Sequence, residues 1–219
     1  MVEQSEIKIA GVVLAGGLSR RMNGIDKSLL ELRGKTMLAH VIERLDAQVS
    51  SLVINANGDP ARFADFGYDV LPDMIEGHAG PLAGIHAGLT WGSELDGITH
   101  IVTAAADTPF LPLDLVSRLS GHLINQDDET VIFASTQGRL HPVFGLWPVH
   151  LGPSLESFLQ ETENRRVVAF AKQHNLVEAS FGNGTLNGAS ARPGWTCQSG
   201  HNSRPKNASG ASWCGARIS

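Results

Sequence analysis

The sequence predicts an α/β protein in which helices cover both faces of a doubly wound, mostly parallel sheet, in three layers. Three observations support this prediction. Apolar runs of strand length alternate with segments of helical period along most of the chain. The first run ends in a glycine-rich loop, and later runs end close to Asn or Asp. In such a sheet these ends share one edge, where ligands bind.

The first predicted elements are a strand, a loop and a helix. The apolar run from Ile7 to Leu14 stops sharply at Ala15-Gly16-Gly17, as expected of a buried central strand that ends in a tight loop. Apolar residues then recur at helical spacing from Met37 to Leu45, and Thr36 is placed to cap the first turn. A second strand is expected at Ser51 to Asn55.

The same alternation continues through the rest of the chain. Strands are expected at Tyr68 to Leu71 and Thr99 to Ala105, with helices near Pro81 to Trp91 and Pro112 to Leu123. The last predicted elements are two strands, 130–135 and 140–147, joined by a hairpin turn at 136–139, and a helical region at 151–173. The loops after Leu14, Asn55, Leu71 and Ala105 should therefore converge.

The composition is that of one domain followed by a tail. The chain has 219 residues, 42% of them apolar, which suffices for one substantial core at residues 1–181. Residues 182–219 contain seven glycines, six serines and no Asp or Glu, and they show no apolar period. We expect this tail to be irregular or disordered.

Charge and targeting signals limit the possible partners. The chain carries 17 Lys and Arg against 22 Asp and Glu, a formal charge of −5 that offers no broad basic surface for a nucleic acid. No apolar run approaches the roughly 20 residues of a membrane helix, and residues 1–17 do not resemble a signal peptide. We expect a cytoplasmic monomer with no membrane partner. Cys197 and Cys214, without CxxC spacing, should be reduced thiols.

The loop after the first strand has the composition of a triphosphate-binding segment. Its glycines allow the backbone to bend closely around phosphates and expose N–H donors, while Arg21 and Lys27 supply positive charge. Two common phosphate loops are excluded. A Walker sequence has Gly directly before Lys-Ser, where this chain has Asp26, and the G-x-G-x-x-G spacing is absent after the first strand.

Asp107 is a candidate metal ligand. It follows the apolar strand THIVTAA and should emerge at the ligand-binding edge of the sheet. Magnesium prefers few carboxylates together with phosphate oxygens, so a carboxylate opposite a phosphate-binding loop suits this ion. The alternative is that Asp107 only turns the chain or caps the helix near Pro112. Asn55 and Asp73, taken alone, are equally compatible with ordinary turns, and no histidine has metal-ligand spacing.

The segment LAGGLSRRMNGIDKSLLELRGKTML resembles the amino-terminal signature of molybdenum cofactor guanylyltransferases. The resemblance runs from about Gly11 to about Phe181 and rests on further motifs in the same order: INAN at 54–57, PD at 72–73, GPLAGI at 80–85, ADTPF at 106–110 and RRV at 165–167. It implies a Rossmann-like nucleotidyltransferase fold. It also implies transfer of GMP from GTP to molybdenum-molybdopterin, with pyrophosphate as the second product.

The family also implies roles for individual residues. Leu14, Ala15 and Gly16 would lie along the nucleotide, Lys27 near the phosphates, and Asn55 and Asp73 in the guanosine site. Asp107 would hold Mg²⁺, and a second set would surround the phosphates or the pterin: Gly24, Gly80, Gly84, Arg21 and Arg166. Further candidate partners are molybdenum insertion proteins and molybdoenzyme chaperones.

Two alternatives to this function stay open at the level of sequence. One is a relative that transfers CMP to molybdopterin, or a nucleotide to a sugar or polyol phosphate; the L-A-G-G motif, where cytidylyl relatives have L-A-A-G, favours the guanylyl branch. The other is a nucleotide-binding protein with impaired catalysis. The family ending resembles N-x-N-T-P-E-D-L, whereas this chain has FGNGTLNGASARPGW. Divergence or a reading-frame shift would explain this tail, and we favour the shift.

Overall fold

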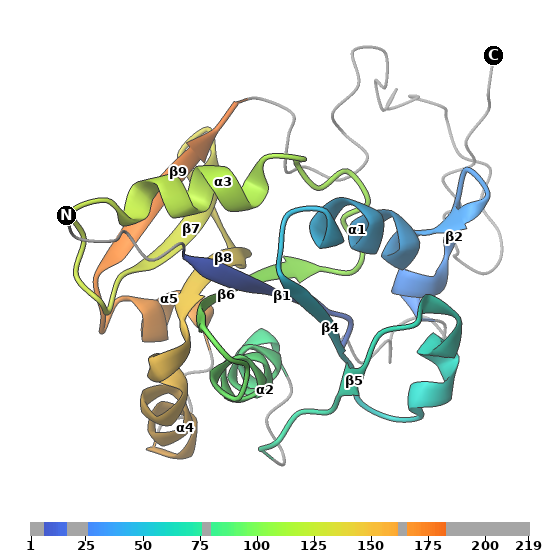
Figure 1. Cartoon of the computed structure of the whole chain (residues 1–219), viewed down its shortest axis with the longest axis horizontal. Coiled ribbons are helices and arrows are strands. Elements are labelled where there is room, and N and C mark those ends of the chain that lie inside the picture. The colour runs from blue at the N-terminus through green and yellow to red at the C-terminus, as the bar shows by residue number, and fades with distance from the viewer. Residues whose placement is uncertain (1–6, 17–25, 76–79, 162–165, 183–219) are drawn as a thin grey trace, which may run out of the picture.

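The computed structural model describes residues 7–16, 26–75, 80–161 and 166–182, which are built around one seven-stranded sheet (Figure 1). The strand order is β5-β4-β1-β6-β8-β7-β9. The strands are β1 (Lys8–Leu14), β4 (Ser51–Asn55), β5 (Val70–Leu71), β6 (Ile98–Ala105), β7 (Val131–Thr136), β8 (Arg139–Pro148) and β9 (Leu176–Phe181). Within this sheet, β8 is antiparallel to both of its neighbours and all other pairs are parallel. The predicted α/β class is confirmed.

Helices cover both faces of this sheet (Figure 1). Helices α1 (Met37–Asp46) and α3 (Leu115–Ser120) lie on one face, and α2 (Pro81–Ser93), α4 (Gly152–Glu161) and α5 (Val167–Ala171) lie on the other. Each face has its own buried apolar cluster, because successive residues of a strand point to opposite sides of the sheet: Val13 belongs to the α1 side and Val12 to the α2 side. The result is the predicted three-layer arrangement.

Two local signals in the sequence act as expected. The Thr36 hydroxyl accepts a hydrogen bond from the Ala39 amide at 3.1 Å and caps α1. At the β7–β8 hairpin, Gln137 and Gly138 both have positive φ, 51° and 72°, as a two-residue type I′ turn requires. This tight turn makes β8 antiparallel to β7.

The structure corrects the sequence prediction at the end of the chain. The predicted helical region 151–173 is not one helix: a 3-10 turn at η4 (Val149–Leu151) leads into α4, and Arg166, in extended conformation, precedes α5. Strand β9 was not predicted. Its burial alternates only weakly, and it is a strand because it pairs in parallel with β7.

Short elements missed by the sequence analysis lie between β1 and β5. A small hairpin pairs β2 (Glu31–Leu32) with β3 (Lys35–Thr36), and two 3-10 helices flank the site described below: η1 (Lys27–Leu29) and η2 (Pro60–Phe66). The predicted helix at 112–123 is shortened to α3 and the 3-10 turn η3 (Gly121–Leu123). Such elements are too short for an apolar period to reveal them.

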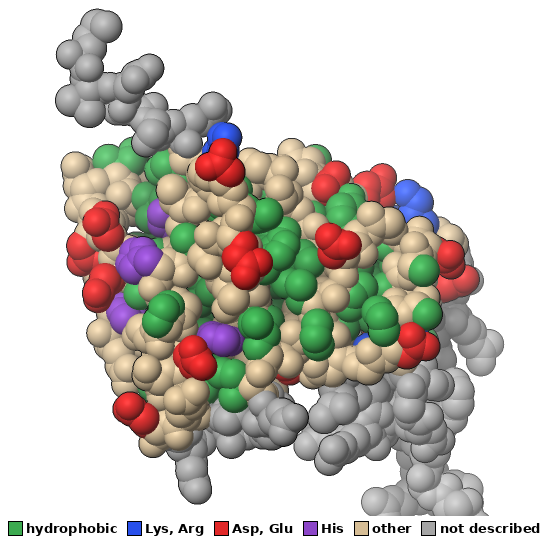
Figure 2. Space-filling view, turned by 60° about the horizontal axis from the view of Figure 1, so that its bottom comes forward, with side chains coloured by type: hydrophobic (Ala, Val, Ile, Leu, Met, Phe, Trp, Pro, Cys, Tyr) green, Lys and Arg blue, Asp and Glu red, His purple; other side chains and the backbone are tan. Residues whose placement is uncertain are grey.

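The surface agrees with the acidic composition. On the face drawn in Figure 2, acidic side chains outnumber basic ones, and the basic groups stand apart from one another. None of the helices in the described ranges has the length and apolar character needed to span a bilayer. The tail at 183–219 lies outside the described residues, so the boundary expected near 181 stays a prediction.

Candidate functional site

Four strand ends meet at the carboxyl edge of the sheet. In the parallel registers, Leu14 pairs with both Asn55 and Ala105, and Asn55 pairs with Leu71. Main-chain hydrogen bonds extend this alignment past the strands: the Ala15 amide donates to the Asn55 carbonyl at 2.8 Å, and the Ala106 amide donates to the Leu14 carbonyl at 3.1 Å. The predicted convergence of the four loops is confirmed.

This edge is also a topological switch point. The chain leaves β1 for β4 and β5 on one side, and then crosses to β6 on the other side of β1. The two connections diverge at β1 and leave a crevice beyond its carboxyl end, which is where open α/β sheets bind ligands. Leu14, Ala15 and Gly16 lie at this point, and their expected place along the nucleotide stays a prediction.

Asn55 and Asp73 form a direct pair at the edge. Asn55 is 2% exposed, and its Nδ2 donates to the Leu71 carbonyl at 3.1 Å and to Asp73 Oδ1 at 3.0 Å. The sequence could not distinguish these residues from turn formers. Their pairing across two loops indicates a built polar site instead.

Asn57 completes this pair and was missed by the sequence analysis. Its Nδ2 donates to Asp73 Oδ2 at 2.7 Å, and its Oδ1 accepts from the Asp73 amide at 2.8 Å. Both carboxylate oxygens of Asp73 are therefore held in place, yet each keeps a lone pair for a ligand donor. The signal for Asn57 is the Asn-x-Asn spacing directly after the strand, within the INAN motif.

Gly84 makes room for Asn55. A Cβ on Gly84 would stand 2.1 Å from Asn55 Oδ1 and 2.9 Å from the Leu14 side chain, so only glycine fits. Gly84 lies in the first turn of α2, whose start at Gly80-Pro81 therefore faces the same edge. The free amides of a helix amino-terminus favour anions, so the start of α2 suits an anionic ligand at this edge.

Lys27 is the first residue of η1. Asp26 caps this turn, since its Oδ1 accepts from the Ser28 amide at 3.0 Å. Lys27 is exposed, and within the described ranges no hydrogen bond or ion pair engages its ammonium group, which is free for an anionic ligand. Arg21, Gly17 and Gly24 lie outside the described residues, so their predicted roles stay predictions.

Asp107 lies two residues past β6, next to Ala106, whose amide is bonded to Leu14. Its side chain is exposed, and in the part of the chain that the structure describes no partner occupies its carboxylate. No group of three or more His, Cys, Asp and Glu side chains that could hold a metal occurs among those residues. One free carboxylate at this edge fits magnesium, which takes few protein ligands and completes its shell with phosphate oxygens and water.

Two other residues stand apart from this group. Arg166 precedes α5, which packs on β8, the strand beyond β6 in the sheet order. His86 follows Gly84 by two residues on α2, and a rotation of about 200° turns its side chain away from Asn55. Burial lowers the pKa of His86, while Glu156 on α4 partly opposes this effect.

A family model described as the MobA-like NTP transferase domain matches residues 11–177. The chain belongs to this family. It is 49% identical over 173 residues to the molybdenum cofactor guanylyltransferase of Mesorhizobium japonicum, covering 79% of this chain and 83% of the relative. The guanylyltransferase of Bradyrhizobium sp. (strain ORS 278) is 45% identical over 182 residues, covering 83% and 85%. The resemblance found in the sequence is confirmed.

Solved structures agree at the level of the fold. A protein from Aquifex aeolicus VF5 superposes with a TM-score of 0.66 at 23% identity, over 87% of this chain and 97% of its own. The molybdopterin-guanine dinucleotide biosynthesis protein A of Archaeoglobus fulgidus superposes with a TM-score of 0.59 at 22% identity, over 78% and 83%. The MobA-like NTP transferase domain of this chain therefore has the expected Rossmann-like nucleotidyltransferase fold.

Proposed function

We propose that this MobA-like chain transfers GMP from GTP to molybdenum-molybdopterin and releases pyrophosphate. The observation that carries the proposal is the identity of 43 to 49% with relatives named molybdenum cofactor guanylyltransferase, over about four fifths of the chain. The carboxyl edge supports it, because a polar pair, a helix amino-terminus and a carboxylate meet there.

The guanosine half of GTP is assigned to the β4 and β5 ends. Guanine and ribose present N–H and O–H donors, and the Asp73 carboxylate, held by Asn55 and Asn57, offers acceptors in a fixed position. Because Asn55 is buried and its amide nitrogen donates both to the Leu71 carbonyl and to Asp73, this part of the site is pre-organised. A pre-organised site loses little entropy on binding.

The triphosphate half is assigned to Gly16, Lys27, the start of α2 and Asp107. The attacking phosphate of molybdopterin is already anionic, so no general base is needed. The residues align the α-phosphorus with this nucleophile and offset the charge that develops on the leaving pyrophosphate. Magnesium bound at Asp107 would supply further positive charge to the phosphates.

Nucleotide choice tests this proposal against the cytidylyl alternative. Titration calorimetry with magnesium should show tighter binding of GTP than of CTP or ATP, and incubation with GTP and molybdenum-loaded molybdopterin should yield the guanine dinucleotide and pyrophosphate. Preferential CTP binding would place the chain in the cytidylyl branch.

The remaining parts of the proposal are a cytoplasmic location, a monomeric state, and contacts with molybdenum insertion proteins and molybdoenzyme chaperones.

A further inference from the structure

Arg62, on the 3-10 helix η2, bridges two segments of the site. Its Nη2 donates to the Asn57 carbonyl at 2.6 Å, and its Nη1 lies 3.6 Å from Asp26 Oδ2. The guanidinium carbon also lies 4.6 Å from the centre of the Phe63 ring. The side chain is 35% exposed and that of Asp26 only 17%, so the ion pair is partly shielded from solvent.

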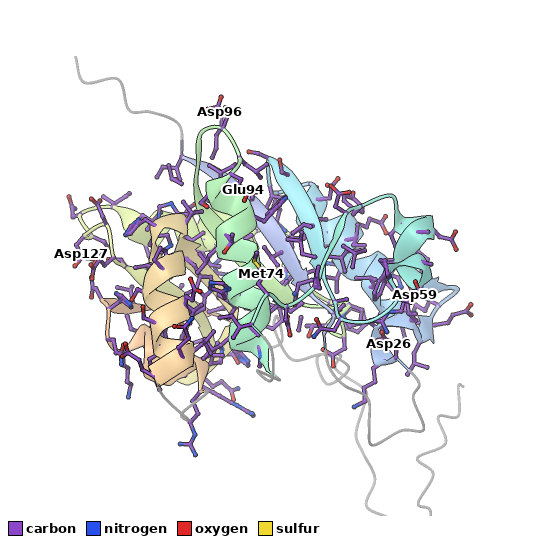
Figure 3. All side chains as sticks on the ribbon, turned by 90° about the horizontal axis from the view of Figure 1, so that it is seen from below. Asp26, Asp59, Met74, Glu94, Asp96 and Asp127 are labelled. Atoms are coloured by element: carbon purple, nitrogen blue, oxygen red, sulfur yellow. The ribbon has the colours of Figure 1, made fainter. Side chains whose placement is uncertain are left out.

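At one end of this bridge, Asp26 controls the turn that carries Lys27. Asp26 Oδ1 accepts from the Ser28 amide at 3.0 Å and from the Ser28 hydroxyl at 2.7 Å, which leaves Oδ2 for Arg62. Lys27 is the next residue, so the placement of Asp26 fixes where its side chain begins. Figure 3 shows Asp26 beside Asp59, the cap of η2, at the opposite end of the molecule from Asp96.

At the other end, Asn57 belongs to the nucleoside side of the site. Its carbonyl binds Arg62 and its side chain binds Asp73 through two hydrogen bonds. Asp73 in turn accepts from Asn55. An unbroken series of polar contacts therefore runs from Asn55 to Asp26, across three loops that are distant in sequence.

We propose that Arg62 is a positioning residue that sets the distance between the nucleoside-binding pair and Lys27. This inference rests on the proposed function, because it assumes that Asn55 and Asp73 bind guanosine and that Lys27 binds phosphate. Without Arg62, the turn at Lys27–Leu29 is no longer tied to the Asn57 loop. The nucleoside contacts remain, but the lysine no longer meets the phosphates at the correct distance.

The structure provides a matched control in Arg118. Its guanidinium also donates to a main-chain carbonyl, that of Ser180 at 2.8 Å, lies 3.7 Å from an aspartate, Asp114, and stands 4.3 Å from a phenylalanine ring, Phe181. These contacts lie on α3 and β9, away from the four strand ends. Arg118→Ala therefore removes the same kinds of interaction without touching the proposed bridge.

The first experiment compares affinities for GMP and GTP with magnesium by calorimetry. Arg62→Ala should weaken GTP binding by about tenfold, the effect of losing the one charge-assisted hydrogen bond from Lys27 to a phosphate. GMP binding should stay within about twofold of wild type. Lys27→Ala should show the same selective loss. Arg118→Ala should bind both ligands like wild type, and Arg62→Lys should recover part of the GTP affinity because it keeps the charge beside Asp26.

A second comparison separates positioning from simple loss of charge. Asp26→Asn keeps an oxygen that can cap η1 but removes the ion pair with Arg62. Positioning predicts that Arg62→Ala weakens GTP binding by about tenfold in the wild type and by less than about twofold in the D26N background. Long-range attraction of the triphosphate by Arg62 would instead weaken GTP binding equally in both backgrounds and would overturn the inference.

The remaining outcomes are also distinct. Two results contradict the positioning role and leave the proposed function intact. In the first, Arg62→Ala loses GMP and GTP affinity equally. In the second, Arg62→Ala binds GTP as well as Arg118→Ala does, while Lys27→Ala binds GTP more weakly. If the wild type binds no guanine nucleotide at all, the proposed function itself is wrong, and this inference falls with it.

Discussion

At the scale of single residues, the site depends on pairs that fit one another. Asn55 can be buried because Gly84 has no side chain, and Asp73 keeps one orientation because Asn55 and Asn57 hold its two oxygens. The Asn55 amide nitrogen and both Asp73 carboxylate oxygens find partners, which offsets much of the cost of burying these groups. A change in one member should therefore act through the other.

Gly84→Ala should displace Asn55, because the added Cβ would stand 2.1 Å from its Oδ1. We expect a loss of stability of about 1 to 3 kcal/mol from overpacking and a fall in kcat/KM for GTP on the order of 100-fold. Urea unfolding and steady-state kinetics measure the two effects. Gly152→Ala is the control, since its Cβ would meet Leu89 at an ordinary 3.7 Å. Equal kinetics in the two variants would argue against the fit between Gly84 and Asn55.

Asp107→Asn should abolish magnesium-dependent transfer and leave the fold intact. The residue is exposed at a strand end, so its replacement costs little stability, whereas an amide is a weaker magnesium ligand than a carboxylate. The measurements are the melting temperature and the rate of transfer as a function of magnesium concentration. Normal turnover with an unchanged magnesium requirement would show that the metal binds elsewhere.

At the scale of elements, capping and packing decide where helices begin. Thr36 caps α1 through its hydroxyl, while four buried side chains of that helix, Leu38, Val41, Ile42 and Leu45, face the sheet. Helix α2 differs from α1 because it is buried on nearly all sides over its first nine residues. Its position is set by glycines, as at Gly88, where a Cβ would stand 2.7 Å from Val12.

Thr36→Ala should destabilise the protein by about 1 kcal/mol, because the Ala39 amide loses its acceptor at the start of α1. Urea denaturation should show a lower midpoint with an unchanged slope. Thr36→Ser keeps the hydroxyl and should retain most of the stability. GTP affinity should stay near wild type in both variants, and an equal loss of stability in the two would rule out the cap as the cause.

At the scale of the whole molecule, a half-buried histidine, His100, makes the fold sensitive to acid. The pKa of His100 is lowered from 6.5 to about 4, chiefly by burial and also by the neighbouring His150, while Asp128 partly opposes the shift. The unfolded chain therefore binds a proton at this residue at higher pH than the folded chain. The contribution of His100 to stability is present above about pH 6.5 and is lost as the pH falls toward 4.

This sign gives a testable profile. Between pH 7 and pH 4 the wild type should lose at most about 3 kcal/mol through His100, at about 1.4 kcal/mol for each unit of pKa difference. In His100→Gln the loss of stability caused by protonation of His100 should disappear. The free energies of unfolding of the wild type and the variant should therefore converge at low pH. Urea unfolding at a series of pH values measures it. Parallel profiles would show that His100 titrates alike in both states.

The tail supplies a second prediction at this scale. A segment without acidic residues or apolar period cannot offset ordering costs of roughly 1 to 2 kcal/mol per residue. A chain stopped after Phe181 should therefore match the full chain in melting temperature and GTP affinity, and one given an N-x-N-T-P-E-D-L ending should gain turnover, on the order of 100-fold. Full activity in the original chain that vanishes on truncation would show the tail to be functional.

The sequence by itself determined the alternation of strands and helices, the cap at Thr36, the β7–β8 turn and the family. These features depend on the spacing of apolar residues, on turn-forming residues and on the order of motifs, all of which are present in the local sequence. The loops expected to meet did meet, because parallel strands place their carboxyl ends at one edge.

Only the tertiary structure decided which side chains act together. Strand β9 exists because β7 offers it a parallel partner, and the helical region at 151–173 is interrupted at Arg166, which lets α5 fold back so that Phe170 contacts Phe158 of α4. Asn57 bonds to Asp73, 16 residues away. Arg62 bonds to the Asn57 carbonyl and pairs with Asp26, which lies 36 residues earlier in the chain. No local period encodes such contacts, since they depend on the sheet order that places the loops side by side.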